Sequence, residues 1–126
     1  MNIQQKTSVN PGPICYSPEE VNFNAIIVVY KSKNGDWKGF THPYGETTEA
    51  NTRAEAIKKM RVLTRAYSDI LRQYDNPSHL INGGLVDLED KEVFNMIFQV
   101  KSNVEKLHSK AGKIDTKNYY AEAYRV

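Results

Sequence analysis

The sequence has few of the features that mark secreted, disulfide-bonded or membrane-spanning proteins. It contains one cysteine in 126 residues, so no internal disulfide can form, and this favours a reducing cytoplasm. The longest apolar run, Ala25–Val29, is far shorter than the roughly 20 residues that a membrane span needs. The first residues, Met1–Lys6, lead into no apolar stretch of signal-peptide length. We therefore expect a cytoplasmic protein that does not contact a membrane.

The usual motifs for catalysis, metal binding and cofactor binding are also missing. His42, His79 and His108 fall in three different segments, without the spacing of metal ligands. No nucleophile elbow, phosphate-binding loop or dinucleotide fingerprint occurs. Catalytic residues can meet in space without being near in sequence, so a spatial triad stays open. We expect a non-catalytic protein with no metal and no cofactor.

The chain carries little charge of either sign in excess. Its 17 Lys and Arg residues against 15 Asp and Glu residues give a net charge of +2. A nucleic-acid binder gains affinity by neutralising many phosphates, so this balance disfavours nucleic acid as the partner. The 40% hydrophobic and 25% charged residues are typical of one ordinary globular domain.

Local patterns in the first half predict an arm followed by two strands. Residues 1–22 are punctuated by proline and predict an irregular arm, with a short extended piece around Ile14–Tyr16 as an open alternative. The β-branched run Phe23–Tyr30 predicts a central buried strand. The Asn-Gly pair within Lys33–Asp36 predicts a hairpin turn into a second strand, Trp37–His42.

A helix is predicted from Thr52 onward. Thr52 and Glu55 have the spacing of a capping box, in which the two side chains satisfy free backbone amides at the start of a helix. Apolar residues then recur at steps of three and four, and Asn76 with Pro77 ends the pattern. This predicted apolar face consists of Ala56, Met60, Leu63, Tyr67, Ile70 and Tyr74.

The last third predicts a second helix and a final strand. Val86–Val100 is rich in β-branched and aromatic residues, so a strand is the alternative. The apolar spacing continues to Leu107, and acidic residues gather where a helix N-terminus favours them, so we predict one long helix. Asn118–Val126 predicts a strand. The expected fold is α+β, a small antiparallel sheet with two helices on one side in the order ββ(β)ααβ, forming a single domain over residues 23–126.

The span Gly35–Met60 resembles the HicB-like fold, the small ββ(β)α module of HicB antitoxins. That family has a glycine and an aromatic residue on the second strand, a Pro-Gly turn, and a Thr-rich run ending in Glu-Ala at the helix. The matching residues are Gly35, Trp37, Gly45, Thr48, Ala50, Thr52, Glu55 and Ala56. The resemblance implies a HicB-like fold and a protein that binds and blocks a partner, such as a ribonuclease toxin or another nuclease.

In size and architecture the chain also resembles the Thoeris anti-defence proteins of phages. Those proteins bind signal nucleotides of the cyclic ADP-ribose type and hold them without cleavage. The resemblance implies a phage or prophage protein that sequesters a phosphorylated, cyclic nucleotide in the bacterial host cytoplasm.

The candidate ligand site combines basic and aromatic side chains. Lys58, Arg61 and Arg65 align along one side of the first helix, and arginine binds phosphate oxygens in bidentate fashion. A solvated helix face explains the same pattern without a ligand. Aromatic rings can stack a base, and Tyr120 and Tyr124 share one face of the last strand. The predicted site residues are Lys58, Arg61, Arg65, Trp37, Tyr44, Asn82, Tyr120 and Tyr124.

A small sheet leaves edge strands that invite a symmetric partner, so we expect a homo-oligomer. The predicted edges are the strand around Ala25–Tyr30 and the last strand, with the segment from Asn118 in the interface.

Overall fold

The computed structural model describes residues 25–75, 85 and 87–125, which together form one sheet and three helices. The elements are β2 (Ala25–Lys31), β3 (Trp37–His42), β4 (Thr47–Ala50), α1 (Arg53–Gln73), α3 (Leu88–Phe98), α4 (Lys101–His108), β5 (Lys113–Asp115) and β6 (Tyr119–Tyr124). The strands pair antiparallel in the order β4-β3-β2-β6-β5. The predicted α+β class is confirmed. The predicted arm, residues 1–22, and the loop containing Asn82 lie outside the described residues.

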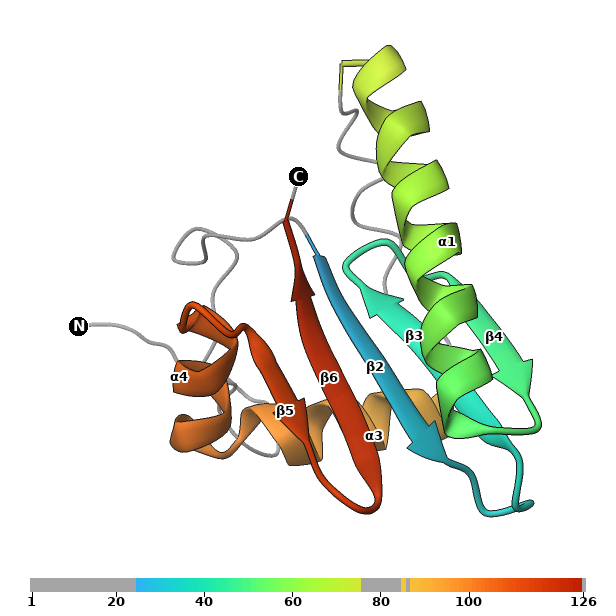
Figure 1. Ribbon diagram of the computed structural model, residues 1–126, viewed down its shortest axis with the longest axis vertical. Helices are drawn as coiled ribbons and strands as arrows, with labels where there is room; N and C mark the ends of the chain where they lie inside the picture. Colours follow the sequence, from blue (N-terminus) through green and yellow to red (C-terminus); the bar gives the residue numbers. More distant parts are fainter. Residues whose placement is uncertain (1–24, 76–84, 86, 126) are drawn as a thin grey trace.

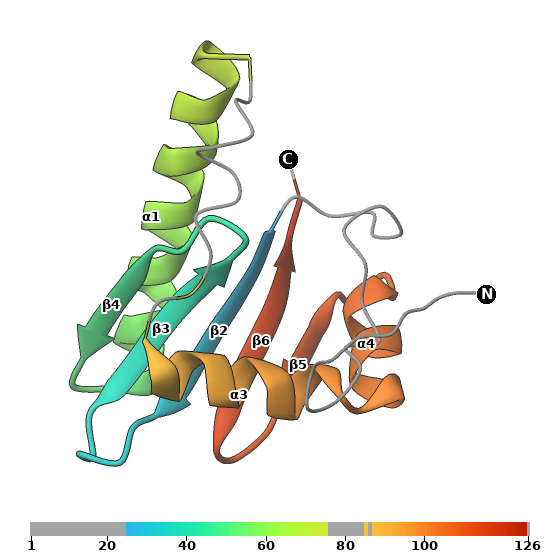
Figure 2. The same cartoon turned by 180° about the vertical axis from the view of Figure 1, so that it is seen from behind.

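The helices cover both faces of the sheet, so the prediction of helices on one side is wrong. Figure 1 shows α1 in front of β2, β3 and β4, and Figure 2 shows α3 across the opposite face. The reason lies in β2, whose alternate side chains are buried on both sides. Ile26 and Val28 pack toward α3 and α4, whereas Ile27 and Val29 pack toward α1. A strand buried on both faces requires a covering layer on each side.

The predicted turn between the first two strands is confirmed. The amide of Gly35 donates to the carbonyl of Ser32 at 3.0 Å, and Gly35 has a φ of 94°, which glycine adopts without strain. After β3 the chain turns through Gly45 and returns as β4, which takes the place of the optional third strand in the predicted order, for which no residue range was predicted. β5 was not predicted, because its three residues are too few to show an alternating pattern.

α1 begins as predicted and buries the predicted Ala56 and Met60, but beyond Met60 its buried face differs from the predicted one. The Thr52 side chain accepts from the amide of Glu55 at 3.1 Å, which confirms the N-cap. The buried residues are Ala56, Met60, Thr64, Ser68 and Leu71, and the predicted core residues Leu63, Ile70 and Tyr74 are exposed. Small side chains suit this face because the helix packs closely on β3. A Cβ added to Gly39 would lie 2.4 Å from Cγ of Met60.

The second helical segment is helical, as predicted, but it is broken into two helices. Gln99 ends α3, and Val100 adopts extended backbone angles as the N-cap of α4. The buried side chain of Asn103 donates to the carbonyl of Ile97 at 3.0 Å, so it satisfies a C-terminal carbonyl of α3 at the break. Breaking the segment turns both Phe98 and Leu107 onto the sheet, where both are fully buried.

The predicted edge strands are in fact central. β2 pairs with β3 on one side and with β6 on the other, and β6 also pairs with β5. The edges of the described sheet are therefore β4 and β5. Apolar content predicted the wrong strands as edges, because the most apolar strand is the one enclosed on all sides.

Candidate functional site

Figure 1 shows α1 over β2, β3 and β4 with β6 and β5 beside it, and a pocket lined by residues of α1, β5 and β6 lies along this side of the helix. We call this region the α1–β6 cleft. Side chains alternate along a strand, and Tyr120 packs with Ile27 on the α1 face, so Glu122 and Tyr124 share that face. Lys113 of β5 lies directly opposite Glu122 in the register. The cleft thus brings together charges from α1, β5 and β6.

A hydrogen-bonded triad joins α1 to β6. Arg61 Nε donates to Glu122 Oε1 at 2.9 Å, and Arg61 Nη2 donates to the Tyr120 hydroxyl at 3.2 Å. That hydroxyl donates to Glu122 Oε1 at 2.8 Å. The bond to Glu122 is the main cause of the raised pKa of Arg61, and burial followed by Glu122 raises the pKa of Tyr120. Both groups therefore keep their protons at neutral pH.

A small pocket of about 250 Å³ lies at this triad. Arg61, Tyr120 and Glu122 line it together with Lys113 and the backbone around Gly112. The guanidinium of Arg61 has five N–H donors, and the bonds to Glu122 and Tyr120 occupy only its Nε and one terminal nitrogen. The Arg61 side chain is 55% exposed, so its other donors are accessible to a ligand. The pocket can accept an anion at the arginine and a donor at the carboxylate.

Arg53 adds a third cation beside this pocket, after Arg61 and Lys113. Its guanidinium pairs with Asp115, donates to the carbonyl of Tyr119 at 3.3 Å, and lies 5.9 Å and 5.8 Å from the ring centroids of Trp37 and Tyr120. These are distances at which a cation is attracted to an aromatic face. Sequence reasoning missed Arg53, Lys113 and Glu122 as site residues. Arg53 and Glu122 take part through contacts between α1 and β6, whose partners are 66 and 61 positions apart, and Lys113 takes part because β5 pairs with β6; no local pattern predicts these contacts.

The structure brings together some of the predicted site residues and separates others. Arg61 and Tyr120 are in contact, Trp37 joins them through Arg53, and Arg65 is exposed one helical turn beyond Arg61. Tyr124 is partly buried at the far end of β6. Three predicted residues are not part of this cleft in the described structure. Tyr44 is 8% exposed with its ring 5.1 Å from that of Tyr67, Lys58 lines another hollow, and Asn82 lies outside the described residues.

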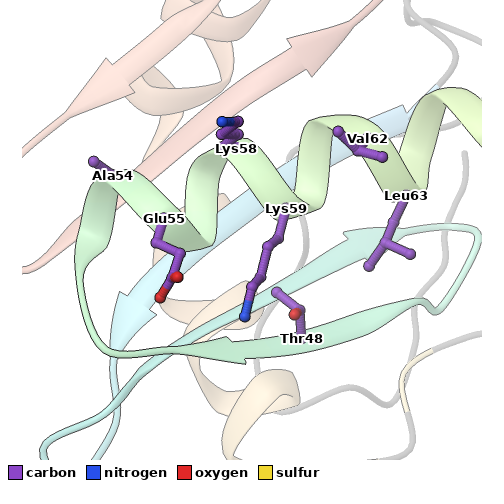
Figure 3. A pocket seen from close by; sticks show the side chains of 7 residues that line it. All are labelled: Thr48, Ala54, Glu55, Lys58, Lys59, Val62 and Leu63. Carbon is purple, nitrogen blue, oxygen red and sulfur yellow. The ribbon is translucent and has the colours of Figure 1, made fainter.

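A larger, shallow groove of about 730 Å³ lies between α1 and β4, and we call it the α1–β4 groove (Figure 3). Lys59 and Leu63 extend from α1 toward β4, and Thr48 points back at them (Figure 3). Lys58 and Val62 complete its rim. Its lining is mainly apolar, in contrast to the charged α1–β6 cleft.

Two further titratable groups lie on the hairpin of β3 and β4, away from the cleft. Burial lowers the pKa of His42 to about 4, and its ring lies 4.5 Å from that of Phe94. Burial raises the pKa of Glu46 to about 7. Among the described residues, no group of three or more His, Cys, Asp or Glu side chains is arranged to hold a metal ion. No helix in the same residues is long and apolar enough to cross a membrane.

Comparisons of this chain with models of protein families, with curated proteins and with solved structures find no match.

Proposed function

We propose that this protein works by binding rather than by turnover, and that it sequesters a phosphorylated nucleotide at the α1–β6 cleft. The observation that supports this most is the convergence of Arg61, Lys113, Tyr120 and Glu122 on one pocket. Arg61 and Lys113 are suited to phosphate oxygens. The Glu122 carboxylate is suited to ribose hydroxyls, the role that an acidic residue has in dinucleotide-binding folds.

The size of the pocket limits what part of a ligand it encloses. At about 250 Å³ it is slightly smaller than the usual range for ligand pockets, which is roughly 300–1,000 Å³. We therefore propose that it encloses one nucleotide moiety. The rest of a larger ligand, such as a cyclic ADP-ribose derivative, would extend over the open face of β6 toward Arg65 and Tyr124.

Binding without cleavage agrees with the side chains that surround the pocket. The described histidines, His42 and His108, lie on β3 and α4, and neither lines it. The Glu122 carboxylate already accepts bonds from Arg61 and Tyr120, which makes it a poor base. This reading also fits the cytoplasmic location expected from the single cysteine.

Calorimetry against linear and cyclic nucleotides tests the proposal. Arg61→Ala should weaken binding by roughly 10- to 150-fold, which corresponds to the loss of one or two hydrogen bonds to a charged group. Arg72→Ala is the matched control, because Arg72 is an exposed arginine on the same helix whose partner is Asp69. No heat of binding at millimolar nucleotide would refute the proposal, and recovery of a hydrolysed product would show an enzyme instead.

A second candidate function is the blocking of a partner protein, as the resemblance to HicB antitoxins implies. The observation that favours it is the apolar surface that α1 exposes to solvent: Val62 is 62% exposed and Tyr74 is 66% exposed. Co-expression with the product of an adjacent toxin-sized reading frame tests this function. Restored growth and a co-purified complex would support it, and continued toxicity would exclude that partner.

A further inference from the structure

The α1–β4 groove lies beside an edge of the sheet whose backbone groups point outward. The amide of Thr41 donates to the carbonyl of Glu46 at 3.0 Å, which fixes the phase of the β3–β4 ladder. Hydrogen-bonded and non-hydrogen-bonded pairs alternate in an antiparallel ladder, so the N–H and C=O groups of Thr47 and Glu49 face away from β3. The side chain of Lys59 confirms this phase, since its Nζ donates to the carbonyl of Glu49 at 3.1 Å.

Among the described residues, β4 pairs with β3 alone, so its outer edge offers a template for a further strand. The outward amides of Thr47 and Glu49 are two residues apart, which is the repeat of an extended chain. A segment that paired here would place alternate side chains over the groove. Binding of this kind takes its affinity from backbone hydrogen bonds and its specificity from the side chains of the groove.

The groove lining defines the chemistry of such a segment. Val62 and Leu63 provide apolar surface and are 62% and 36% exposed. Lys58 and Lys59 provide positive charge. The single acidic residue of the lining, Glu55, accepts from the amide of Asn51 at 3.2 Å as part of the helix cap. The groove therefore presents apolar surface with a net positive charge.

We propose that the α1–β4 groove binds an extended segment of a partner protein that pairs with β4 as an additional strand, and that the every-second residues of this segment that face the groove include both apolar and acidic side chains. The apolar side chains would cover Val62 and Leu63, and the acidic ones would meet Lys58 and Lys59.

A second copy of this chain fits the same groove less well. Two copies that paired β4 with β4 about a two-fold axis would place groove against groove. The lysines of one copy would then approach those of the other, and like charges in contact oppose association. Charge complementarity therefore favours an acidic partner segment.

This inference rests on the second candidate function, to which it gives a surface, and it is independent of nucleotide binding at the α1–β6 cleft. The partner-blocking function and the binding of a segment in the groove can fail separately. If co-expression with a partner restores growth but the groove binds no peptide, the partner contacts another face of the molecule.

Selection from a phage-displayed library of random peptides of about ten residues tests the proposal, since that length exceeds the length of β4. The selected peptides should carry both acidic and apolar residues at positions two apart, which share one face of a strand, and they should shift the amide resonances of Thr47 and Glu49 in the full-length protein. Glu49→Pro removes an outward N–H without removing a bond to β3, so it should weaken peptide binding roughly tenfold or more. Lys58→Glu should weaken binding to a similar degree, and Lys101→Glu on α4 is the control.

Four results would overturn the proposal. The first is that no peptide is enriched, and the second is that the enriched peptides are basic or bind Glu49→Pro and Lys58→Glu as well as the original chain. The third is a dimer that Glu49→Pro converts to monomer, because the occupant is then a second copy. The fourth is slow hydrogen exchange at Thr47 and Glu49 in the isolated monomer, because the chain then covers its own edge.

Discussion

The two faces of the sheet differ in the side chains that cover them. The face under α3 and α4 is a continuous apolar core with packed aromatic rings. The ring centroid of Phe94 lies 4.5 Å from that of Phe98 and 6.4 Å from that of Phe40. The face under α1 is smaller and more polar, because Thr64 and Ser68 occupy the buried side of that helix. Both candidate sites flank α1, on its two sides. We therefore expect that one face carries most of the stability, and both proposed binding surfaces lie on the other.

The α3 end of the molecule also has an anchoring polar network. The Tyr30 hydroxyl donates to the buried carboxylate of Asp90 at 2.5 Å, and Lys38 Nζ lies 3.7 Å from Asp90 and 3.3 Å from Asp87. Burial raises the pKa of Asp90, an effect that the bonds to Tyr30 and Lys38 oppose. A buried charge with such partners fixes the start of α3 on β2 and β3.

The largest loss of stability is expected for a substitution on the α3 and α4 face. Phe98→Ala should lower the free energy of unfolding by about 3–5 kcal/mol, because Phe98 is fully buried and the ring leaves a cavity. Denaturant unfolding measures this loss. Met96→Ala is the matched control on the same helix, since Met96 is 51% exposed and its change should stay within about 0.5 kcal/mol. A small loss at Phe98 would contradict the assignment of stability to this face.

The second prediction is that acid lowers the free energy of unfolding through His42, whose ring contacts Phe94 of α3. His42 is partly buried with a pKa near 4, below its ordinary value of 6.5, so below pH 6.5 the unfolded chain binds a proton that the folded chain does not. The free energy of unfolding should therefore be unaffected by His42 above about pH 6.5. It should fall by roughly 2–3 kcal/mol as the pH decreases toward 4. The difference in unfolding free energy between the original chain and His42→Phe, measured across this range, isolates it. A difference independent of pH would refute the prediction.

A moderate effect is expected where α1 packs on β3. Gly39→Ala places a methyl group against Met60 and should cost about 1–3 kcal/mol of stability. Met60→Ala removes the obstructing atoms, so the double variant should be more stable than the sum of the single losses predicts. Unfolding measurements on the four chains of this cycle test the contact. Strict additivity would show that α1 does not pack closely on Gly39.

The smallest effect on folding is expected in the α1–β6 cleft. Sequence reasoning predicts almost no change in stability for Arg61→Ala, because exposed arginines contribute little. The structure changes this expectation, since Arg61 bonds to Glu122 and Tyr120. With Arg61 55% exposed and screened by solvent, the coupling energy between Arg61→Ala and Glu122→Gln should be about 0.5–1 kcal/mol. A coupling of several kcal/mol would make the triad a structural element and not a binding surface.

How far the sequence predicts this molecule depends on whether the signal is local. The Asn-Gly turn, the Thr52 cap and the buried run of β2 are encoded within a few residues, and the structure confirms all three. The buried face of α1 was predicted correctly for Ala56 and Met60 but wrongly beyond them, because apolar spacing cannot identify Thr64 and Ser68 as core positions. The burial of β2 on both sides was nevertheless visible in its unbroken apolar run.

The sequence predicted those residues of the candidate site whose position follows from the pattern of a single helix or strand. Arg61 and Arg65 follow from helical spacing, and Tyr120 and Tyr124 from strand alternation. The partners Glu122 and Lys113 require knowledge of which strand lies beside α1. That arrangement is decided by how β6 enters the centre of the sheet, which no short pattern encodes.

The pairing of β6 with β2 also determines the order in which the molecule can assemble. Ala25 lies opposite Tyr124, so the centre of the sheet closes only after almost the whole described chain has been brought together. Such distant pairing slows folding, because the entropy of closing a long loop is lost before its contacts form. A circular permutant that joins Tyr124 to Ala25 by a short turn and opens within residues 32–36 would convert this pairing into a local hairpin. It should keep the same sheet and reach it faster.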